Sequence, residues 1–130
     1  SQKDINDLME TLDSNYLGWS SAMAPVIMGN PERPELAAEL EESFCQNNPK
    51  IARHFAKVTF RGDNRSDLKK LTTDTLIIQS KTDAIASIKV GHFVHDSISN
   101  SKLVVLETTG HCPHLSAPNQ TIEAMKKYLL

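Results

Sequence analysis

The stretch LVVLETTGHCPHLSAP, residues 103–118, decides the fold. Its four consecutive apolar residues, 103–106, are typical of a strand that is buried on both faces, and the Thr-Thr-Gly after them presents His111 at the strand's carboxyl end. In open sheets of parallel strands, ligands and catalytic groups collect at that end. An imidazole there is well placed to exchange protons near neutral pH. The alternative is a loop histidine that only hydrogen-bonds to the backbone.

Composition and charge exclude several functional classes. The 130 residues carry 14 Lys and Arg against 16 Asp and Glu, and no basic stripe follows a path for a phosphate backbone, so we expect no nucleic acid partner. The apolar runs are too short to span a membrane, and the chain shows no secretory leader. Two isolated cysteines, Cys45 and Cys112, favour free thiols in a reducing compartment. These features predict a soluble, cytoplasmic protein.

The first half of the chain has the pattern of four helices. Apolar residues recur at three- and four-residue spacing over residues 4–16, and we expect Gly18 to separate this helix from a second apolar segment, residues 19–28. Residues 35–44 predict a third helix, and Pro49 suits the first turn of a fourth that continues to residue 60. The polar, turn-rich residues 61–66 then predict a boundary between two parts of the chain.

Beyond this boundary strands alternate with helices. Residues 76–78 and 103–106 predict two short buried strands, residues 85–98 a helix between them, and residues 122–129 a final helix. This order predicts a right-handed parallel βαβ unit. Two parallel strands that are apolar on both faces need further strands beside them, so we expect a larger sheet whose other strands lie outside this sequence. The sequence also begins without methionine, which agrees with a longer polypeptide.

Two residues at the ends of these strands form the candidate catalytic pair. Asp83 follows the first strand and His111 follows the second. Because adjacent parallel strands end at the same edge of a sheet, we expect an Asp83–His111 hydrogen bond. A carboxylate that orients an imidazole is the supporting half of a catalytic triad, and the order Asp then His suits an enzyme whose serine comes earlier in the chain. These residues contain no G-x-S-x-G motif.

Several residues near these positions allow other interpretations. Asp74 and Asp96 also lie near the ends of elements, but neither comes just after a buried strand, and we interpret them as turn or cap residues. His111, Cys112 and His114 resemble metal ligands, yet a closed zinc site needs four ligands, so we predict no metal site. Cys112 has no exposed turn to present it as a nucleophile. His114 is interpreted as a residue that braces the loop.

Three segments resemble a known family: SFCQNNPKIARHFAK (residues 43–57), TLIIQSKTDAIASIKVG (residues 75–91) and TGHCPHLSAP (residues 109–118). In this order they look like the C-terminal half of an α/β-hydrolase, in the branch of the RsbQ-like hydrolases of bacterial stress signalling and the plant karrikin and strigolactone receptors. The resemblance implies an α/β fold, with a four-helix lid over residues 1–60 and the C-terminal part of the hydrolase core over residues 61–130. It assigns Asp83 as triad acid and His111 as triad base, and implies no cofactor.

The resemblance also implies what this sequence lacks. The serine, the oxyanion-hole amides and the first five or six strands would lie upstream of Ser1, in an N-terminal half on the same or a separate chain. The implied reaction is hydrolysis of a small hydrophobic ester or lactone-like compound. Apolar lid residues that would line its pocket, or else pack between lid helices, are Trp19, Met23, Ile27, Met28 and Phe55.

Two other functional classes remain as alternatives. In the first, the protein is a small-ligand receptor that docks a signalling protein, with slow or incidental turnover. In the second, the chain is a free-standing βαβ binding module with a helical cap. The second requires exposed sheet edges, which proteins avoid.

Overall fold

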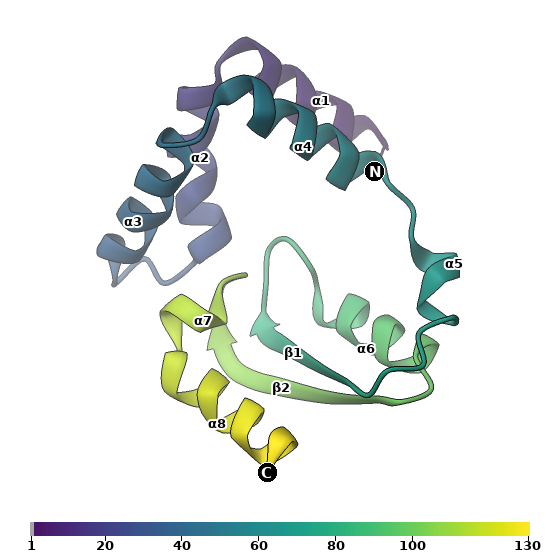
Figure 1. Ribbon diagram of the computed structural model, residues 1–130. Helices are drawn as coiled ribbons and strands as arrows, with labels where there is room; N and C mark the ends of the chain where they lie inside the picture. Colours follow the sequence, from purple (N-terminus) through teal and green to yellow (C-terminus); the bar gives the residue numbers. More distant parts are fainter. Residues whose placement is uncertain (1) are drawn as a thin grey trace.

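The computed structural model describes residues 2–130 as a helical part followed by a small α/β part (Figure 1). The helical part contains α1 (Gln2–Ser14), α2 (Tyr16–Met28), α3 (Pro34–Cys45) and α4 (Pro49–Arg61). The α/β part contains α5 (Arg65–Leu68), β1 (Thr75–Thr82), α6 (Ile88–Ser97), β2 (Ser101–Thr109), α7 (Pro113–Ser116) and α8 (Pro118–Leu129).

The helical part is built from two pairs of helices. α1 lies against α4, and α2 lies against α3 (Figure 1). The buried side chains of Met9, Leu12 and Tyr16 form its core, and partly buried apolar residues from α1, α2 and α4 pack around them. The Tyr16 hydroxyl donates a hydrogen bond to the Phe44 carbonyl oxygen at 2.8 Å and so joins α2 to α3 within one pair.

All four predicted helices are present, but the expected break at Gly18 is wrong. α2 already begins at Tyr16, and Gly18 lies in its first turn. The chain breaks at Asn15, three residues before Gly18, because the Asn15 side chain accepts a hydrogen bond from the Gly18 N–H at 3.0 Å and caps the new helix. Asparagine is a stronger signal for a helix start than glycine is for a helix end at this point.

β1 and β2 pair in parallel, as predicted. Their register runs from Thr75 opposite Ser101 to Ser80 opposite Leu106. The next aligned pair is Thr82 and Thr109, so β2 carries one extra residue near its carboxyl end. Such a bulge bends a strand and changes the direction in which the following side chains point. Both strands are longer than their apolar runs, and in β1 the two buried residues, Gln79 and Ser80, come after the run.

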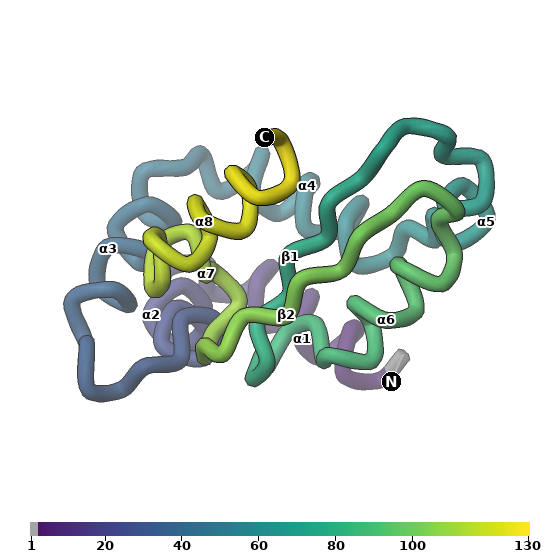
Figure 2. The backbone as a smooth tube through the Cα atoms, turned by 90° about the horizontal axis from the view of Figure 1, so that it is seen from below, coloured from purple at the N-terminus to yellow at the C-terminus, as the bar shows by residue number. Residues whose placement is uncertain are grey.

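One helix covers each face of this two-stranded sheet. α6 and α8 both contact the strands, and they lie on opposite sides of the sheet in Figures 1 and 2. We expected the apolar strand residues to be buried, yet in this chain only Leu106 among residues 103–106 is buried, while Ile77 and Ile78 are half-buried. A single helix per face leaves part of each strand uncovered.

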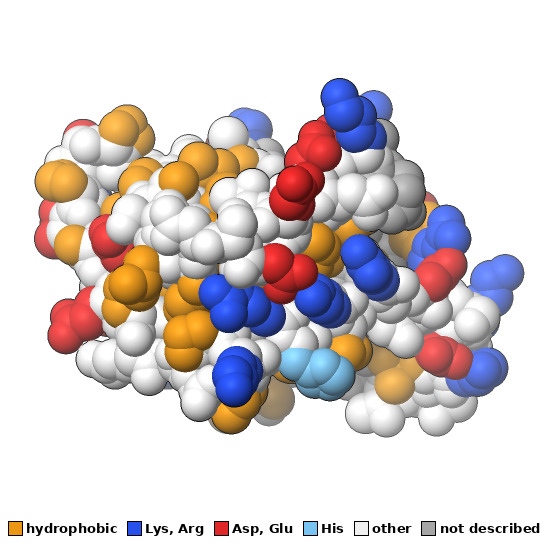
Figure 3. Space-filling model, turned by 90° about the horizontal axis from the view of Figure 1, so that it is seen from above, with side chains coloured by type: hydrophobic (Ala, Val, Ile, Leu, Met, Phe, Trp, Pro, Cys, Tyr) orange, Lys and Arg blue, Asp and Glu red, His pale blue; other side chains and the backbone are white. Residues whose placement is uncertain are grey.

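Loops and short helices account for the remaining differences. α6 begins at Ile88 rather than residue 85, because the Asp83 carboxylate holds residues 83–86 in a turn. α5 and α7 were not predicted, since four residues are too few to show a helical period. Figure 3 shows one face of the molecule, on which hydrophobic side chains reach the surface between basic and acidic ones. No helix within residues 2–130 has the length and apolar character that crossing a membrane requires.

Candidate active site

Asp83 and His111 meet at the carboxyl edge of the sheet. His111 Nδ1 lies 2.8 Å from Asp83 Oδ2. Because an ionised carboxylate only accepts hydrogen bonds, the Nδ1–H donates to it, which leaves the lone pair of Nε2 free to take a proton. The Asp83 side chain is 4% exposed and the His111 side chain is 43% exposed. The arrangement is a buried acid that orients an accessible base.

The loop after β1 holds the Asp83 carboxylate in place. Asp83 Oδ1 accepts hydrogen bonds from the backbone N–H groups of Ile85, at 2.8 Å, and Ala86, at 3.0 Å. Burial alone raises the pKa of this carboxyl, but the hydrogen bonds from Ala86, His111 and Ile85 outweigh it. The pKa of Asp83 therefore lies below its ordinary value, and the carboxylate is ionised at neutral pH.

Gln79 supports the same loop from inside β1 and was missed in the sequence. Its side chain is buried, and Nε2 donates to the carbonyl oxygens of Ser80 and Ala86, each at 3.0 Å. The same nitrogen lies 3.5 Å from Asp83 Oδ2. Gly91 of α6 leaves room for this side chain, since a Cβ there would lie 2.8 Å from Gln79 Oε1. A polar residue directly after the apolar run 76–78 was the signal available.

The loop after β2 positions His111 through its backbone. Gly110, at φ +97°, donates its N–H to the Thr82 carbonyl oxygen at 2.8 Å and so joins the ends of the two strands. The His111 N–H donates to the Ile27 carbonyl oxygen of α2 at 2.7 Å. Among the hydrogen bonds of residues 2–130, none joins a serine hydroxyl to the His111 ring.

The neighbours of His111 do not form a second reactive group. Burial raises the pKa of the Cys112 thiol, and the negative charge of Asp83 acts in the same direction. Cys112 is therefore held as a thiol rather than as a nucleophilic thiolate. His114 is exposed on α7. Across residues 2–130, no group of three or more His, Cys, Asp or Glu side chains is arranged to hold a metal ion.

The predicted pocket residues occupy different environments. Trp19 lies near Tyr16 and Phe44, with ring centroids 6.2 Å and 5.4 Å apart, so it contributes to the packing of the helical part. Met23 and Ile27 follow it along α2 at intervals of four residues and are half-buried. The exposure of the other two residues of the set differs further: Met28 is fully buried, whereas Phe55, on α4, is exposed.

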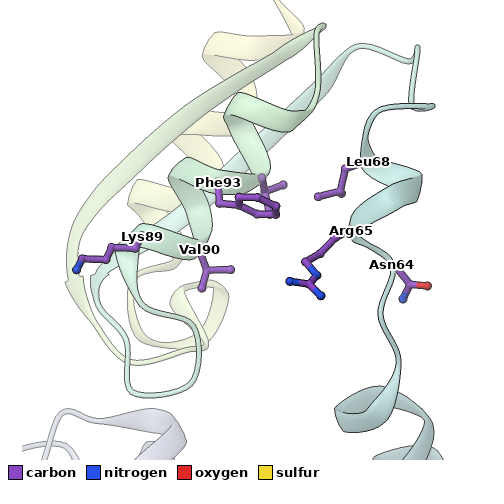
Figure 4. Close-up of a pocket in the computed structure, with 7 residues that line it drawn as sticks. Asn64, Arg65, Leu68, Lys89, Val90 and Phe93 are labelled. Atoms are coloured by element: carbon purple, nitrogen blue, oxygen red, sulfur yellow. The ribbon is translucent and has the colours of Figure 1, made fainter. Parts of the chain in front are cut away.

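An open groove of about 440 Å³ lies elsewhere, between α5 and α6 (Figure 4). Leu68 and Phe93 point toward one another across it, and Val90 and Val94 add apolar surface. Neither Asp83 nor His111 lines this groove. The groove therefore offers apolar contact but none of the acid and base groups of the candidate site.

Comparison with known proteins agrees with the fold. The family model described as TAP-like protein, of the α/β-hydrolases, matches residues 40–130. A karrikin insensitive 2 receptor from Petunia hybrida is 30% identical over 98% of this chain, and the match covers 47% of the receptor. The strigolactone esterase D14 of Arabidopsis thaliana is 25% identical over 97% of this chain and is matched over 47% of its own length.

Solved structures give the same result. A hydrolase from Oleispira antarctica superposes with a TM-score of 0.94 and 37% identity, over 98% of this chain and 47% of that one. An esterase from Exiguobacterium antarcticum has a TM-score of 0.87 at 22% identity, over 98% of this chain and 48% of its own, and shows the same fold. This chain thus spans about half the length of the relatives it matches. The chain belongs to the TAP-like family of α/β-hydrolases and corresponds to the C-terminal portion of their fold.

Proposed function

We propose that this chain supplies the acid and base of a serine-hydrolase triad. The supporting observation is the 2.8 Å hydrogen bond between Asp83 and His111, which follow adjacent parallel strands. In this proposal Asp83 fixes the tautomer of His111, and His111 Nε2 takes the proton of a serine. The serine and the oxyanion hole come from an N-terminal portion of the hydrolase.

The proposed substrate is a small hydrophobic ester or lactone-like compound. The helical part, α1 to α4, acts as the lid expected over residues 1–60, and apolar residues on its inner side line the pocket. Of the candidates, Ile27 contacts the loop of the proposed base through its backbone, because its carbonyl oxygen accepts the His111 N–H. During acyl transfer to the serine, His111 gives the proton it took from the serine to the departing alkoxide, and it then activates a water molecule that cleaves the acyl-enzyme.

Two histidines of the same loop give a matched test in the complete protein. His111→Ala removes the group that contacts Asp83, whereas His114→Ala removes an exposed imidazole three residues later. We expect His111→Ala to lower the turnover of an aryl ester by about 10⁴-fold or more and His114→Ala to keep it within about twofold. Parental turnover by the His111→Ala protein would refute the triad assignment.

A receptor role is the second candidate, because relatives that match 98% of this chain are karrikin receptors by name. In this role the lid docks a signalling protein when a small ligand is bound, and turnover is slow or incidental. The His111→Ala protein separates the two functions. A receptor that does not depend on turnover retains ligand-dependent partner binding in this variant, whereas an enzyme alone shows no such binding in any variant.

A further inference from the structure

The loop that carries His111 is also where the helical part is attached. Three hydrogen bonds within residues 2–130 join the helical part to the α/β part: Ile27 O accepts from His111 N at 2.7 Å, Asn30 Nδ2 donates to Thr109 O at 2.9 Å, and Arg33 Nη1 donates to Ser116 O at 2.7 Å. Each of them ends between residues 109 and 116. The position of the helical part and the position of His111 are therefore linked directly.

Asn30 is the side chain that spans this attachment next to His111. Its Nδ2 donates one hydrogen bond to the Met28 carbonyl oxygen at 2.8 Å and one to the Thr109 carbonyl oxygen at 2.9 Å. An amide NH₂ has two hydrogens, so both are used, one on each side of the junction. Asn30 has φ +53°, a left-handed conformation that asparagine tolerates better than most residues.

The two backbones at this junction are in direct contact. A Cβ on Gly110 would collide with the Met28 carbonyl oxygen, so the loop after β2 lies against the end of α2 with no side chain between them. In such a contact, a shift of the α2 end displaces the His111 backbone rather than being absorbed by flexible side chains. A displacement of about 1 Å in a catalytic group can cost about 100-fold in rate.

We propose that Asn30 is a positioning residue that ties the end of α2 to the His111 loop, so that the position of the helical part sets the position of the His111 imidazole. This inference rests on the proposed catalytic role of His111. It assigns a function to a residue whose side-chain hydrogen bonds go to Met28 and Thr109 rather than to Asp83 or the His111 ring. Movement of the helical part on ligand binding then changes the alignment of the catalytic pair.

The test uses Asn30→Gly in the complete protein. Glycine keeps the positive φ without strain and removes only the amide that bridges Met28 and Thr109. We expect kcat for an aryl ester to fall about tenfold with KM nearly unchanged, and the His111 backbone amide to exchange its hydrogen faster. Asn47→Gly is the matched control, since its Nδ2 donates to Ser43 O at 2.7 Å within the helical part. It should leave kcat and His111 exchange at parental values.

Several results would overturn the proposal. Parental kcat and parental His111 exchange in Asn30→Gly would show that the bridge positions nothing, and so would an equal loss of kcat in Asn47→Gly. If the glycine variant does not fold, Asn30→Asp keeps the side-chain shape, removes both donors and must show the same loss of kcat. If the His111→Ala protein keeps its esterase activity, the proposed function itself is refuted. If His111→Ala is inactive but Asn30→Gly has parental kcat, only the positioning role of Asn30 is refuted.

Discussion

At the scale of single residues, Asp83 is the group whose chemistry is most constrained. One of its oxygens accepts two backbone N–H groups and the other accepts the His111 Nδ1–H. In Asp83→Asn, we expect the amide oxygen to keep the hydrogen bonds from the backbone N–H groups of Ile85 and Ala86. The amide NH₂ group then faces His111. His111 Nδ1 must then accept, and the proton moves to Nε2, where it blocks the nitrogen proposed as the catalytic base.

We therefore expect Asp83→Asn to lower kcat about 10⁴-fold while KM stays within about twofold, measured by steady-state kinetics on an aryl ester. The size and shape of the side chain hardly change, so the fall in kcat reports the change of the His111 tautomer alone. A fall of less than about tenfold would mean that Asp83 only shapes the loop.

The same substitution has a pH-dependent effect on stability. Because hydrogen bonds hold the pKa of Asp83 below its ordinary value, the ionised carboxylate stabilises the fold above the unfolded-state pKa of about 3.9. That stabilisation is lost as pH falls through the lower folded-state pKa. The difference in unfolding free energy between the parent and Asp83→Asn, from urea titrations, should therefore shrink from about pH 6 to about pH 3. A constant difference would contradict this.

Whether a site residue could be predicted from the sequence depends on how far along the chain its partner lies. The positions of Asp83 and His111 follow from strand ends, which apolar runs reveal. Asn30 could not be found in this way, because it acts on the Thr109 carbonyl 79 positions later and no local pattern marks that contact. Gln79 left a weaker sign, a polar side chain between apolar and small residues of β1.

At the scale of elements, the packing of α6 on β1 depends on one missing side chain. Alanine favours a helix over glycine by about 1 kcal/mol, so Gly91→Ala alone would be expected to stabilise α6. A Cβ there, however, would lie 2.8 Å from Oε1 and 3.1 Å from Cγ of Gln79, which is buried and tied to two carbonyl oxygens. This close contact makes the effect of Gly91→Ala on the unfolding free energy destabilising.

We expect Gly91→Ala to lower the unfolding free energy by about 1 kcal/mol or more, measured by urea titration. In a Gln79→Ala background the obstacle is absent, and the same change should raise it by up to about 1 kcal/mol. A Gly91→Ala effect of the same sign in both backgrounds would show that the contact with Gln79 does not control this packing.

Element type was predictable from sequence, whereas element boundaries depended on side-chain hydrogen bonds. The periodicity of α1 to α4 and the apolar runs of β1 and β2 record burial, which is what shapes such patterns. The start of α2 depends on the Asn15 side chain, and the late start of α6 on Asp83. The side chains of these polar residues compete with the helix for hydrogen bonds to backbone groups, and they produce no periodic pattern in the sequence.

At the scale of the whole molecule, the chain exposes surfaces that proteins usually cover. Ile51, Phe55 and Val58 of α4 are 69%, 70% and 60% exposed and lie on one stripe of the helix, at intervals of four and three residues. β1 pairs with β2, and within residues 2–130 no other strand joins the sheet. The need for further strands was predictable from the sequence. Parallel strands that are apolar on both faces occur within larger sheets, in which helices cover both faces.

Production of residues 1–130 alone, compared with the complete protein, tests where the rest of the site lies. We expect the isolated piece to give no burst of product from an aryl ester, because its His111 has no serine to activate. It should also bind a hydrophobic dye and exchange the amide hydrogens of β1 quickly. The complete protein should show a burst equal to its active-site concentration and slow exchange in β1.

The burst and the exchange separate two parts of this prediction. A stoichiometric burst from residues 1–130 alone would place the nucleophile inside them and refute a serine on another portion of the hydrolase. Slow β1 exchange and no dye binding, with no burst, would mean that the two-stranded sheet is stable by itself, and would favour a βαβ binding module over a hydrolase part. Fast exchange that becomes slow when an N-terminal portion is added, together with the appearance of the burst, requires both halves to build one sheet and one triad.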